Sequence, residues 1–245
     1  MNGILNNSNE AKLNSNYYNK FWQKYELNNE DKIRSLFIQR NLKKLNLRTT
    51  EILDLGCGYG WMSNFLKKFG NYTGVDFSNS SIEFANKNFK ENGNFILADE
   101  MSLTLGLPIE KKFDIIVCSE VIEHVVDQIS FVQQIQMFLK PNGHLFLTTP
   151  NQSCWNNFTK IHDRKNMQPV ENWLSFDDIK KLFVEDDWSI IKSEGRILFP
   201  ALNNKYTAFA SRFMDKLTHV LYLEDFYMYF LKKYSLYQML VIKKK

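Results

Sequence analysis

The sequence is poor in the residues that mark fibrous, disulfide-bonded or membrane-spanning proteins. Its 245 residues include three Cys (57, 118 and 154) without CxxC spacing, so we expect neither a disulfide framework nor a structural zinc site. Ten Gly and five Pro are too few for a collagen-like or linker-rich chain. No apolar run approaches the roughly 18 residues of a membrane-spanning helix. Because the Asn-rich N-terminus also lacks the layout of a signal peptide, we expect a soluble, cytoplasmic protein.

The residues that are present indicate one globular domain with an uneven charge. Hydrophobic residues make up 44% of the chain and charged residues 24%, and the length suffices for a complete core. The net charge of +4 is unevenly placed, since residues 196–245 carry nine Lys or Arg against three Asp or Glu, and the remainder 22 against 24. The same segment holds 11 of the 36 aromatic residues. The basic excess therefore belongs to one aromatic-rich C-terminal segment.

Helical patterns open the chain and then alternate with short apolar runs. The stretch 17–25 is aromatic and amphipathic, and 30–45 is spaced as a helix lying on a core. The apolar face expected for the second helix consists of Ile33, Leu36, Phe37, Leu42 and Leu45. Further helices are predicted at 61–69, 79–91, 127–140 and 174–184. Asp127 and Ser175 are the expected N-caps of the last two, and the turn 141–143 is expected to end the third.

The apolar runs predict seven strands, at 51–55, 72–75, 94–98, 113–118, 144–148, 188–192 and 236–242. Strands separated by helices predict an α/β fold with a doubly wound, mainly parallel sheet. The chain shows no repeats and no low-complexity linker, so we expect a single domain. Its parts are N-terminal helices (1–48), a core (49–194), a helical insertion (195–235), and the last strand with a basic tail (236–245).

The strongest motif, ILDLGCGYG, ends the first predicted strand and precedes a helix. Its glycines, Gly56, Gly58 and Gly60, let the backbone turn sharply and approach a ligand closely at the carboxyl edge of the sheet. A dinucleotide fold would carry GxGxxG, whereas the spacing here is GxGxG and Asp54 lies inside the motif. A carboxylate at that place would repel a phosphate and suits a cationic or amine-bearing ligand.

Acidic residues also end the next two predicted strands. Asp76 ends the second strand, where a carboxylate could accept hydrogen bonds from both hydroxyls of a ribose. Asp99 follows the third strand, where it could accept from an adenine amino group while Met101 packs on the ring. The three acids would thus contact an amino-acid group, a ribose and an adenine, which are the successive parts of S-adenosylmethionine.

With these motifs the chain resembles the class I (Rossmann-like) S-adenosylmethionine-dependent methyltransferases over about residues 45–195, and 236–242 resembles the final, antiparallel strand of that fold. The resemblance implies S-adenosylmethionine as cofactor and S-adenosylhomocysteine as product. The cofactor contacts that it implies are Asp54, Gly56, Gly58, Gly60, Asp76, Phe77, Asp99, Glu100, Met101 and Glu120. A nicotinamide-dependent oxidoreductase, and a scaffold or sensor that binds the cofactor without catalysis, are the alternatives.

The stretch SEVIEHV, residues 119–125, follows the fourth predicted strand. If it forms one helical turn, Glu120, Glu123 and His124 share a face. Two carboxylates and an imidazole at that place suit a divalent cation such as Mg²⁺ or Mn²⁺. Alternatively, Glu123 and His124 act in catalysis, with His124 as the general base, or both residues simply brace the turn.

The pattern E-x-x-E-H is similar to one found in ubiquinone-pathway O-methyltransferases and in terminal 2′-O-methyltransferases of small RNAs. In both groups it is associated with a divalent metal. The similarity to the quinone enzymes also implies His162 as a fourth ligand. The chain departs from them in lacking their extra loop glycines and in carrying a long late insertion. On this resemblance we expect O-methylation of a hydroxyl on a small or lipid-linked metabolite, with N-methylation or RNA 2′-O-methylation as alternatives.

The acceptor should be enclosed by the N-terminal helices, the loop 149–169 and the insertion. Candidate walls are Tyr17, Trp22, Trp155 and Phe158, each of which could also be ordinary core. The basic aromatic segment 196–245 has three interpretations: a lid or homodimer contact, peripheral attachment to a membrane surface, or RNA binding. RNA is the least favoured, because the basic cluster is modest and carries no RNA-binding signature.

Overall fold

The computed structural model describes residues 17, 20, 26–47, 50–98, 107–108, 110–161, 168–198 and 235–245, without the side chains of 157–161 and 197–198. The strands are β1 (Thr50–Leu55), β2 (Gly70–Asp76), β3 (Asn94–Leu97), β4 (Phe113–Ser119), β5 (Leu139–Pro150), β6 (Trp188–Leu198) and β7 (Ser235–Lys244). The α-helices are α2 (Asn29–Leu45), α3 (Ser63–Leu66), α4 (Asn79–Phe89), α5 (Gln128–Phe138), α6 (Gln152–Ile161) and α7 (Phe176–Leu182). Two 3₁₀ turns, η2 (Lys90–Asn92) and η3 (Ile122–His124), complete the described elements.

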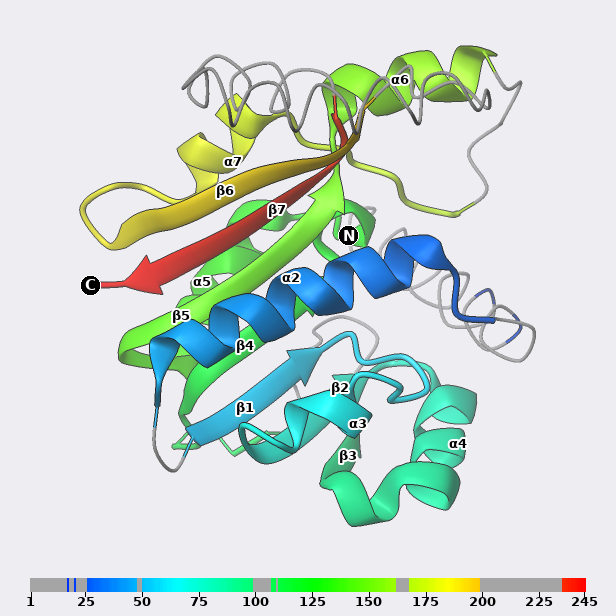
Figure 1. The fold of residues 1–245 in the computed structure, drawn as a ribbon, viewed down its shortest axis with the longest axis vertical. Helices are drawn as coiled ribbons and strands as arrows, with labels where there is room; N and C mark the ends of the chain where they lie inside the picture. Colours follow the sequence, from blue (N-terminus) through cyan, green and yellow to red (C-terminus); the bar gives the residue numbers. More distant parts are fainter. Residues whose placement is uncertain are drawn as a thin grey trace, which may run out of the picture.

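Within the described residues the strands form one seven-stranded sheet in the order β3-β2-β1-β4-β5-β7-β6 (Figure 1). The neighbours from β3 to β5 pair in parallel, and β7 pairs antiparallel with both β5 and β6. The predicted α/β class with a mainly parallel seven-stranded sheet and an antiparallel last strand is confirmed. The order reverses at β1 and β4, and ligands of such sheets bind beyond the carboxyl ends of the strands at that reversal.

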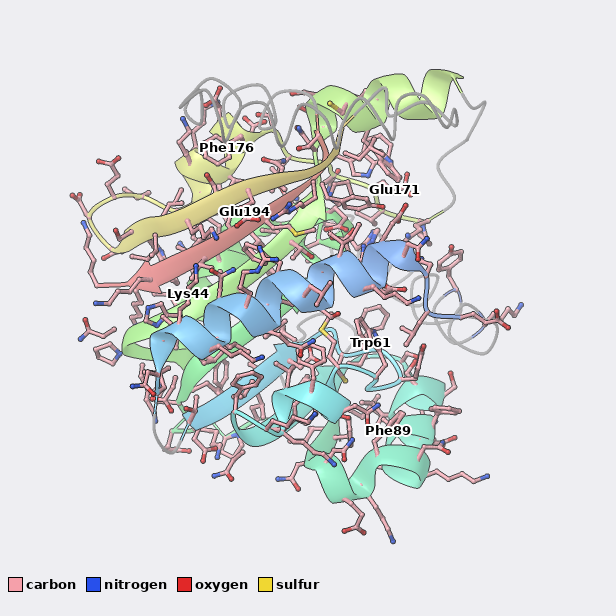
Figure 2. The ribbon with its side chains drawn as sticks, in the orientation of Figure 1. Lys44, Trp61, Phe89, Glu171, Phe176 and Glu194 are labelled. Carbon is pink, nitrogen blue, oxygen red and sulfur yellow. The ribbon has the colours of Figure 1, made fainter. Side chains whose placement is uncertain are left out.

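Helices cover both faces of the sheet and bury two apolar layers (Figures 1 and 2). On one face α5 and α7 pack against strand side chains, with Phe131, Ile135 and Phe183 buried. On the other face α2, α3, α4 and α6 do the same, with Ile38 and Leu66 fully buried. The central strands are therefore apolar on both sides, as in other doubly wound folds.

Two helices begin at caps that the sequence predicts. The Asp127 side chain accepts from the Ser130 amide and begins α5, and Ser175 and Asp178 form a capping box at α7. An equivalent capping box at Asn28 begins α2. The predicted face of α2 is wrong at one position, because Leu36 is 58% exposed and Ile38 takes its place in the core.

Other boundaries differ from the prediction. Helix α5 ends at Phe138 instead of 140, because Leu139 already pairs with Phe113 and the turn 141–143 lies inside the long strand β5. The helix predicted at 61–69 shrinks to α3, Ser63–Leu66. Strand β6 extends six residues past the predicted 188–192, so the insertion predicted at 195–235 begins in a strand. Residues 199–234 of that insertion, and most of the helix predicted at 17–25, lie outside the described residues.

Two further expectations concern cysteines and membrane spans. Cys57, Cys118 and Cys154 are buried and form no disulfide with one another. None of the helices in the described part of the chain combines the length and the apolar character that crossing a membrane would require.

Candidate functional site

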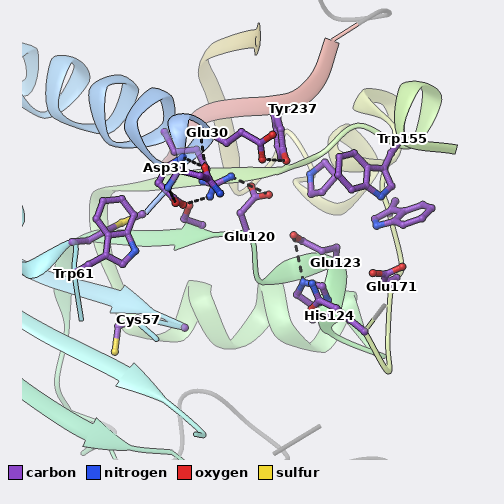
Figure 3. A pocket seen from close by; sticks show the side chains of 18 of the residues that line it. Glu30, Asp31, Cys57, Trp61, Glu120, Glu123, His124, Trp155, Glu171 and Tyr237 are labelled. Carbon is purple, nitrogen blue, oxygen red and sulfur yellow. Dashed lines mark hydrogen bonds and ion pairs between the residues drawn. The ribbon is translucent and has the colours of Figure 1, made fainter. Parts of the chain in front are cut away.

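A cavity of about 240 Å³ opens at the carboxyl ends of β1 and β4, where the strand order reverses. Helix α2, the loop before α7, α6 and β7 supply the rest of its wall (Figure 3). The side chains and backbone that line it belong to Asn28, Glu30, Asp31, Arg34, Asp54, Gly56, Cys57, Trp61, Met62, Ser119, Glu120, Glu123, His124, Pro150, Trp155, Gln168, Glu171, Trp173 and Tyr237. Two sets of predicted residues, the glycine motif and the E-x-x-E-H motif, thus meet in one cavity.

The glycine loop turns sharply, as predicted, and does so through left-handed backbone. Gly56, Gly58 and Gly60 have φ of 74°, 54° and 83°. At Gly56 a Cβ atom would lie 2.4 Å from Val121 Cγ2, so glycine is required for close packing as well as for the turn. The loop is anchored because the amides of Gly56 and Cys57 both donate to the Val75 carbonyl. Of the three glycines, Gly56 lines the cavity.

Asp76, the predicted ribose ligand, lies at the end of β2 and is 4% exposed. Its carboxylate accepts from the Gly58 amide and from the Ser78 amide, each at 2.8 Å. Burial raises the pKa of Asp76 to about 6, although these backbone hydrogen bonds act in the opposite direction. The side chain therefore braces the glycine loop, and neither Asp76 nor Phe77 lines the cavity.

Asp54, at the penultimate position of β1, lines the cavity and is 2% exposed. Its Oδ2 accepts a 2.9 Å hydrogen bond from the hydroxyl of Tyr72 on β2. Burial, together with the negative charge of Asp76, raises the pKa of Asp54 to about 7, and the Tyr72 hydrogen bond opposes the rise. A cation in the cavity would compensate this buried carboxylate.

The structure corrects the expected placement of Glu120. Glu120 precedes the turn η3 and has a φ of 57°, so it does not share a helical face with Glu123 and His124. Its amide donates to the Thr148 carbonyl, and its Oε1 accepts from the Thr148 hydroxyl, both at 2.9 Å. Arg34 lies 3.5 Å from Oε2. Burial raises the pKa of Glu120 to about 7, against the opposing charge of Arg34.

Glu123 and His124 lie side by side in the cavity (Figure 3). Glu123 is 1% exposed, its Oε2 accepts from the Thr149 hydroxyl at 2.9 Å, and burial raises its pKa to about 7. His124 Nε2 lies 3.7 Å from Glu123 Oε1. His124 Nδ1 lies 2.8 Å from the Val170 carbonyl, which only accepts, so Nδ1 carries the hydrogen. Burial lowers the pKa of His124 and favours the neutral imidazole.

The loop before α7 fixes this histidine. The Asn172 amide donates to the Glu123 carbonyl at 2.6 Å, and its side chain donates to the Val125 carbonyl. Gln128 donates to the carbonyls of both Ile122 and Asn172. The loop and η3 are therefore joined at several points, which holds the imidazole in one orientation.

Aromatic side chains form the wall opposite the glycine loop. The ring of Trp155 on α6 lies 6.0 Å from that of Trp173 and 5.9 Å from that of Tyr237 on β7. Trp155 is a predicted wall, whereas the sequence reasoning missed Trp173 and Tyr237. Burial, together with the nearby Glu171 carboxylate, raises the pKa of the phenol of Tyr17, another predicted wall.

Sequence reasoning also missed the part that α2 takes in the site. Arg34, whose side chain is 8% exposed, pairs with Asp31 and Glu120 and lies over the Tyr237 ring at 5.6 Å. The Tyr237 hydroxyl donates to Glu30 at 2.6 Å. The capping-box pattern at Asn28 could have indicated where α2 begins. The contact between Glu30 and Tyr237 joins residues some 200 positions apart, so no local sequence pattern predicts it.

Some predicted residues lie outside the described part of the chain. These are Asp99, Glu100, Met101, Trp22 and the proposed metal ligand His162. The side chain of Phe158 is likewise outside it. Within the described residues no group of three or more His, Cys, Asp or Glu is arranged to hold a metal ion, and Glu120, Glu123 and His124 are engaged as given above. The metal site therefore stays a prediction.

Comparison with known proteins agrees with this arrangement. An S-adenosylmethionine-dependent methyltransferase from Clostridium acetobutylicum superposes with a TM-score of 0.60 at 17% identity, over 86% of this chain and 91% of that chain, which shows the shared fold. The ubiquinone biosynthesis O-methyltransferase of Rickettsia felis is 28% identical over 204 residues, covering 78% of this chain and 83% of that protein.

The ubiquinone biosynthesis O-methyltransferase of Histophilus somni is 36% identical over 115 residues, which cover 44% of this chain and 48% of that protein. The chain thus spans about half the length of several curated relatives that it matches. The profile of a family described as a methyltransferase domain matches residues 24–192, more than half of the sequence. With its glycine loop, its strand order and this match, the chain belongs to the methyltransferase-domain family.

Proposed function

We propose that the protein is an S-adenosylmethionine-dependent methyltransferase that methylates a hydroxyl of a small or lipid-linked metabolite. One observation carries the proposal: a single cavity joins the end of β1, with Asp54 and Gly56, to the imidazole of His124. The described residues fit the methionine end of the cofactor, because a left-handed glycine loop leaves room beside a buried carboxylate that a cation would compensate. Asp54 and Gly56 would hold that end, and Glu120 would lie beside it.

The cofactor, when bound, supplies an already activated methyl group, so the protein mainly has to align the acceptor and remove its proton. His124 is suited to take that proton. Its Nδ1 hydrogen is bound to Val170, so the lone pair is on Nε2, and burial keeps the imidazole neutral near pH 7. Glu123 lies beside Nε2 and stabilises the imidazolium that forms.

The aromatic wall indicates what part of an acceptor the cavity would contact. Trp155, Trp173 and Tyr237 offer apolar ring surface in the cavity that the buried carboxylates also line. Relatives named as ubiquinone biosynthesis O-methyltransferases support an oxygen acceptor. N-methylation is the second candidate, because carboxylates and aromatic rings in one cavity also suit an amine.

Calorimetric titration with S-adenosylhomocysteine, with and without Mg²⁺ or Mn²⁺, tests the cofactor and the metal. We expect binding that Asp54→Asn weakens, because the variant loses the buried carboxylate. No binding to the wild-type protein would contradict the proposal. An effect of the divalent ion that Glu123→Gln or His162→Ala removes would support the metal site.

Substitution of His124 tests the general base. We expect His124→Ala to lower turnover of the acceptor about 100-fold or more, since general-base catalysis contributes that much, while S-adenosylhomocysteine binds as before. His124→Gln serves as a control that retains a polar side chain of similar reach. Full turnover in both variants would eliminate the base role.

We further propose that the segment 196–245 contacts a membrane surface or a second copy of the chain. Its excess of six positive charges supports membrane contact. Co-sedimentation with vesicles of anionic lipid is expected, and should weaken when Lys243–Lys245 are replaced by Gln. A protein that stays in the supernatant at low salt would contradict membrane contact. Sedimentation velocity reads the oligomeric state in the same samples.

A further inference from the structure

A buried tyrosine, Tyr72, lies next to Asp54, the carboxylate that we propose binds the cofactor. Tyr72 pairs in register with Ile52, and Gly74, two residues on, pairs with Asp54. Residues two apart on a strand face the same side of a sheet, so the Tyr72 side chain extends along β2 across Gly74 toward Asp54. Its hydroxyl donates to Asp54 Oδ2 at 2.9 Å, and both residues are 2% exposed.

Gly74 leaves the space through which this hydroxyl reaches Asp54. A Cβ atom at Gly74 would lie 2.7 Å from the Tyr72 hydroxyl oxygen and 2.9 Å from Cys57 Sγ. Phe95 on β3 packs against the Tyr72 ring with centroids 5.4 Å apart. The tyrosine is therefore held on several sides, and its hydroxyl has a fixed direction.

The groups around Asp54 show why the hydrogen bond from Tyr72 affects the protonation state of this carboxyl. The titratable groups near the carboxylate are the Tyr72 hydroxyl, the Cys57 thiol and the Asp76 carboxylate, and the Cys118 thiol of the neighbouring strand β4 points to the opposite face of the sheet. Burial raises the pKa of the tyrosine and of both thiols well above their ordinary values, so all three are neutral. Asp76 adds a like charge, and Tyr72 is the member of this group that stabilises the ionised form of Asp54.

We propose that Tyr72 is a positioning residue of the cofactor site, whose hydroxyl orients the Asp54 carboxylate for the ammonium of the cofactor's methionine end and favours its ionised form. The inference rests on the cofactor placement proposed above. A carboxylate has several lone-pair sites, so one hydrogen bond from Tyr72 leaves it able to accept from a ligand. Tyr72 contacts the carboxylate and need not contact the cofactor.

The test is the pH dependence of S-adenosylhomocysteine binding to Tyr72→Phe, measured by calorimetry without turnover. The variant keeps the ring and removes the hydroxyl, so the Asp54 pKa should rise further. A rise of about one unit weakens binding roughly tenfold near pH 6.5, and the deficit should fall below about threefold at pH 8.5, where the carboxylate ionises in both proteins. A deficit that is the same at every pH, or none, overturns the inference.

Thr50→Val is the matched control. Thr50 lies at the other end of β1, is 2% exposed, and its hydroxyl has no hydrogen-bond partner among the described residues. Removing that hydroxyl should leave both the affinity and its pH profile unchanged. A shifted profile in Thr50→Val would show that loss of a buried hydroxyl elsewhere in the sheet has the same effect, and would overturn the specific role of Tyr72.

Asp54→Asn separates this inference from the proposed function. In that background Tyr72→Phe should cause no further pH-dependent loss, because the group that it acts on no longer titrates. If Asp54→Asn binds S-adenosylhomocysteine as tightly as the wild type, the cofactor placement itself fails. If Asp54→Asn weakens binding and Tyr72→Phe does not, the placement stands and the role of Tyr72 fails. Thermal unfolding of each variant confirms that it is folded.

Discussion

At the scale of single residues, the carboxyl edge of the sheet buries acidic groups at a cost to the protein without its ligand. Asp54 and Asp76 are almost fully buried, and burial raises their pKa values to about 7 and about 6. The ammonium of the proposed cofactor would offset this burial, so we expect the protein without its ligand to be the less stable form. Such local conflicts between stability and site chemistry are common where ligands bind.

The pH dependence of stability follows from the raised pKa of Asp54. The carboxyl titrates near pH 7 when folded and near 3.8 as an unperturbed group, so the folded state binds the proton more tightly. Its favourable contribution is complete below pH 3.8 and is lost as the pH rises through 7. We expect the melting temperature of the ligand-free protein to fall between about pH 4 and 7 and to level off above that range.

Asp54→Asn should flatten this fall and raise the melting temperature at pH 8, because it removes a buried charge. Differential scanning calorimetry of both proteins across that range measures the two slopes. Asp114→Asn is a suitable control, since Asp114 is partly exposed and pairs with Lys140. Identical slopes in wild type and Asp54→Asn would show that Asp54 is not the titrating group.

At the scale of elements, helix α2 forms one side of the cavity and contributes the buried guanidinium of Arg34. The helix begins at a capping box and buries Phe37, Ile38 and Leu42 against the sheet. Its first turns carry Arg34, which joins Asp31 of the same helix to Glu120 beyond β4. The fit of α2 therefore depends on apolar burial along its length and on one guanidinium at the site.

Replacing Arg34 tests that dependence. Arg34→Met should lower the free energy of unfolding by about 3 kcal/mol, because Asp31 and Glu120 would lose a buried partner. Arg34→Lys should recover part of the loss, since it restores the charge without the forked geometry. Arg40→Met is the matched control on the exposed side of the same helix. Equal effects of the two methionine variants in urea denaturation would contradict the role of Arg34.

The element scale also shows where local patterns succeed. The caps at Asp127 and Ser175 begin their helices as predicted, because a cap is a contact between residues three positions apart. The end of α5 was predicted wrongly, because Leu139 is drawn into pairing with Phe113 on a neighbouring strand. The placement of Glu120 outside the helical turn has a similar cause, since Thr148 on β5 holds both its amide and its carboxylate.

At the scale of the whole molecule, strand β7 joins β6 to the rest of the sheet. β7 lies between β5 and β6, pairs antiparallel with both, and is buried from Ser235 to Ile242. Its Tyr237 also reaches the cavity and bonds Glu30 of α2. The C-terminal strand therefore completes the core and the site together.

Deleting residues 235–245 tests this closure. The truncated chain should lose its cooperative unfolding transition, because β5 and β6 would be left without their shared partner and with exposed apolar side chains. Deleting Lys245 alone, which is exposed at the end of the chain, should change little. A cooperative transition and S-adenosylhomocysteine binding in the longer deletion would show that β7 is dispensable.

The sequence by itself determined the alternation of strands and helices, the glycine loop with Asp54, and the acidic end of β2, because each depends on periodicity or on backbone freedom within a few residues. Only the tertiary structure decided that Tyr72 reaches Asp54, that Arg34 pairs with Glu120, and that Tyr237 and Trp173 wall the cavity. These contacts join residues distant in the chain, and the packing that creates them is a property of the folded sheet and its covering helices.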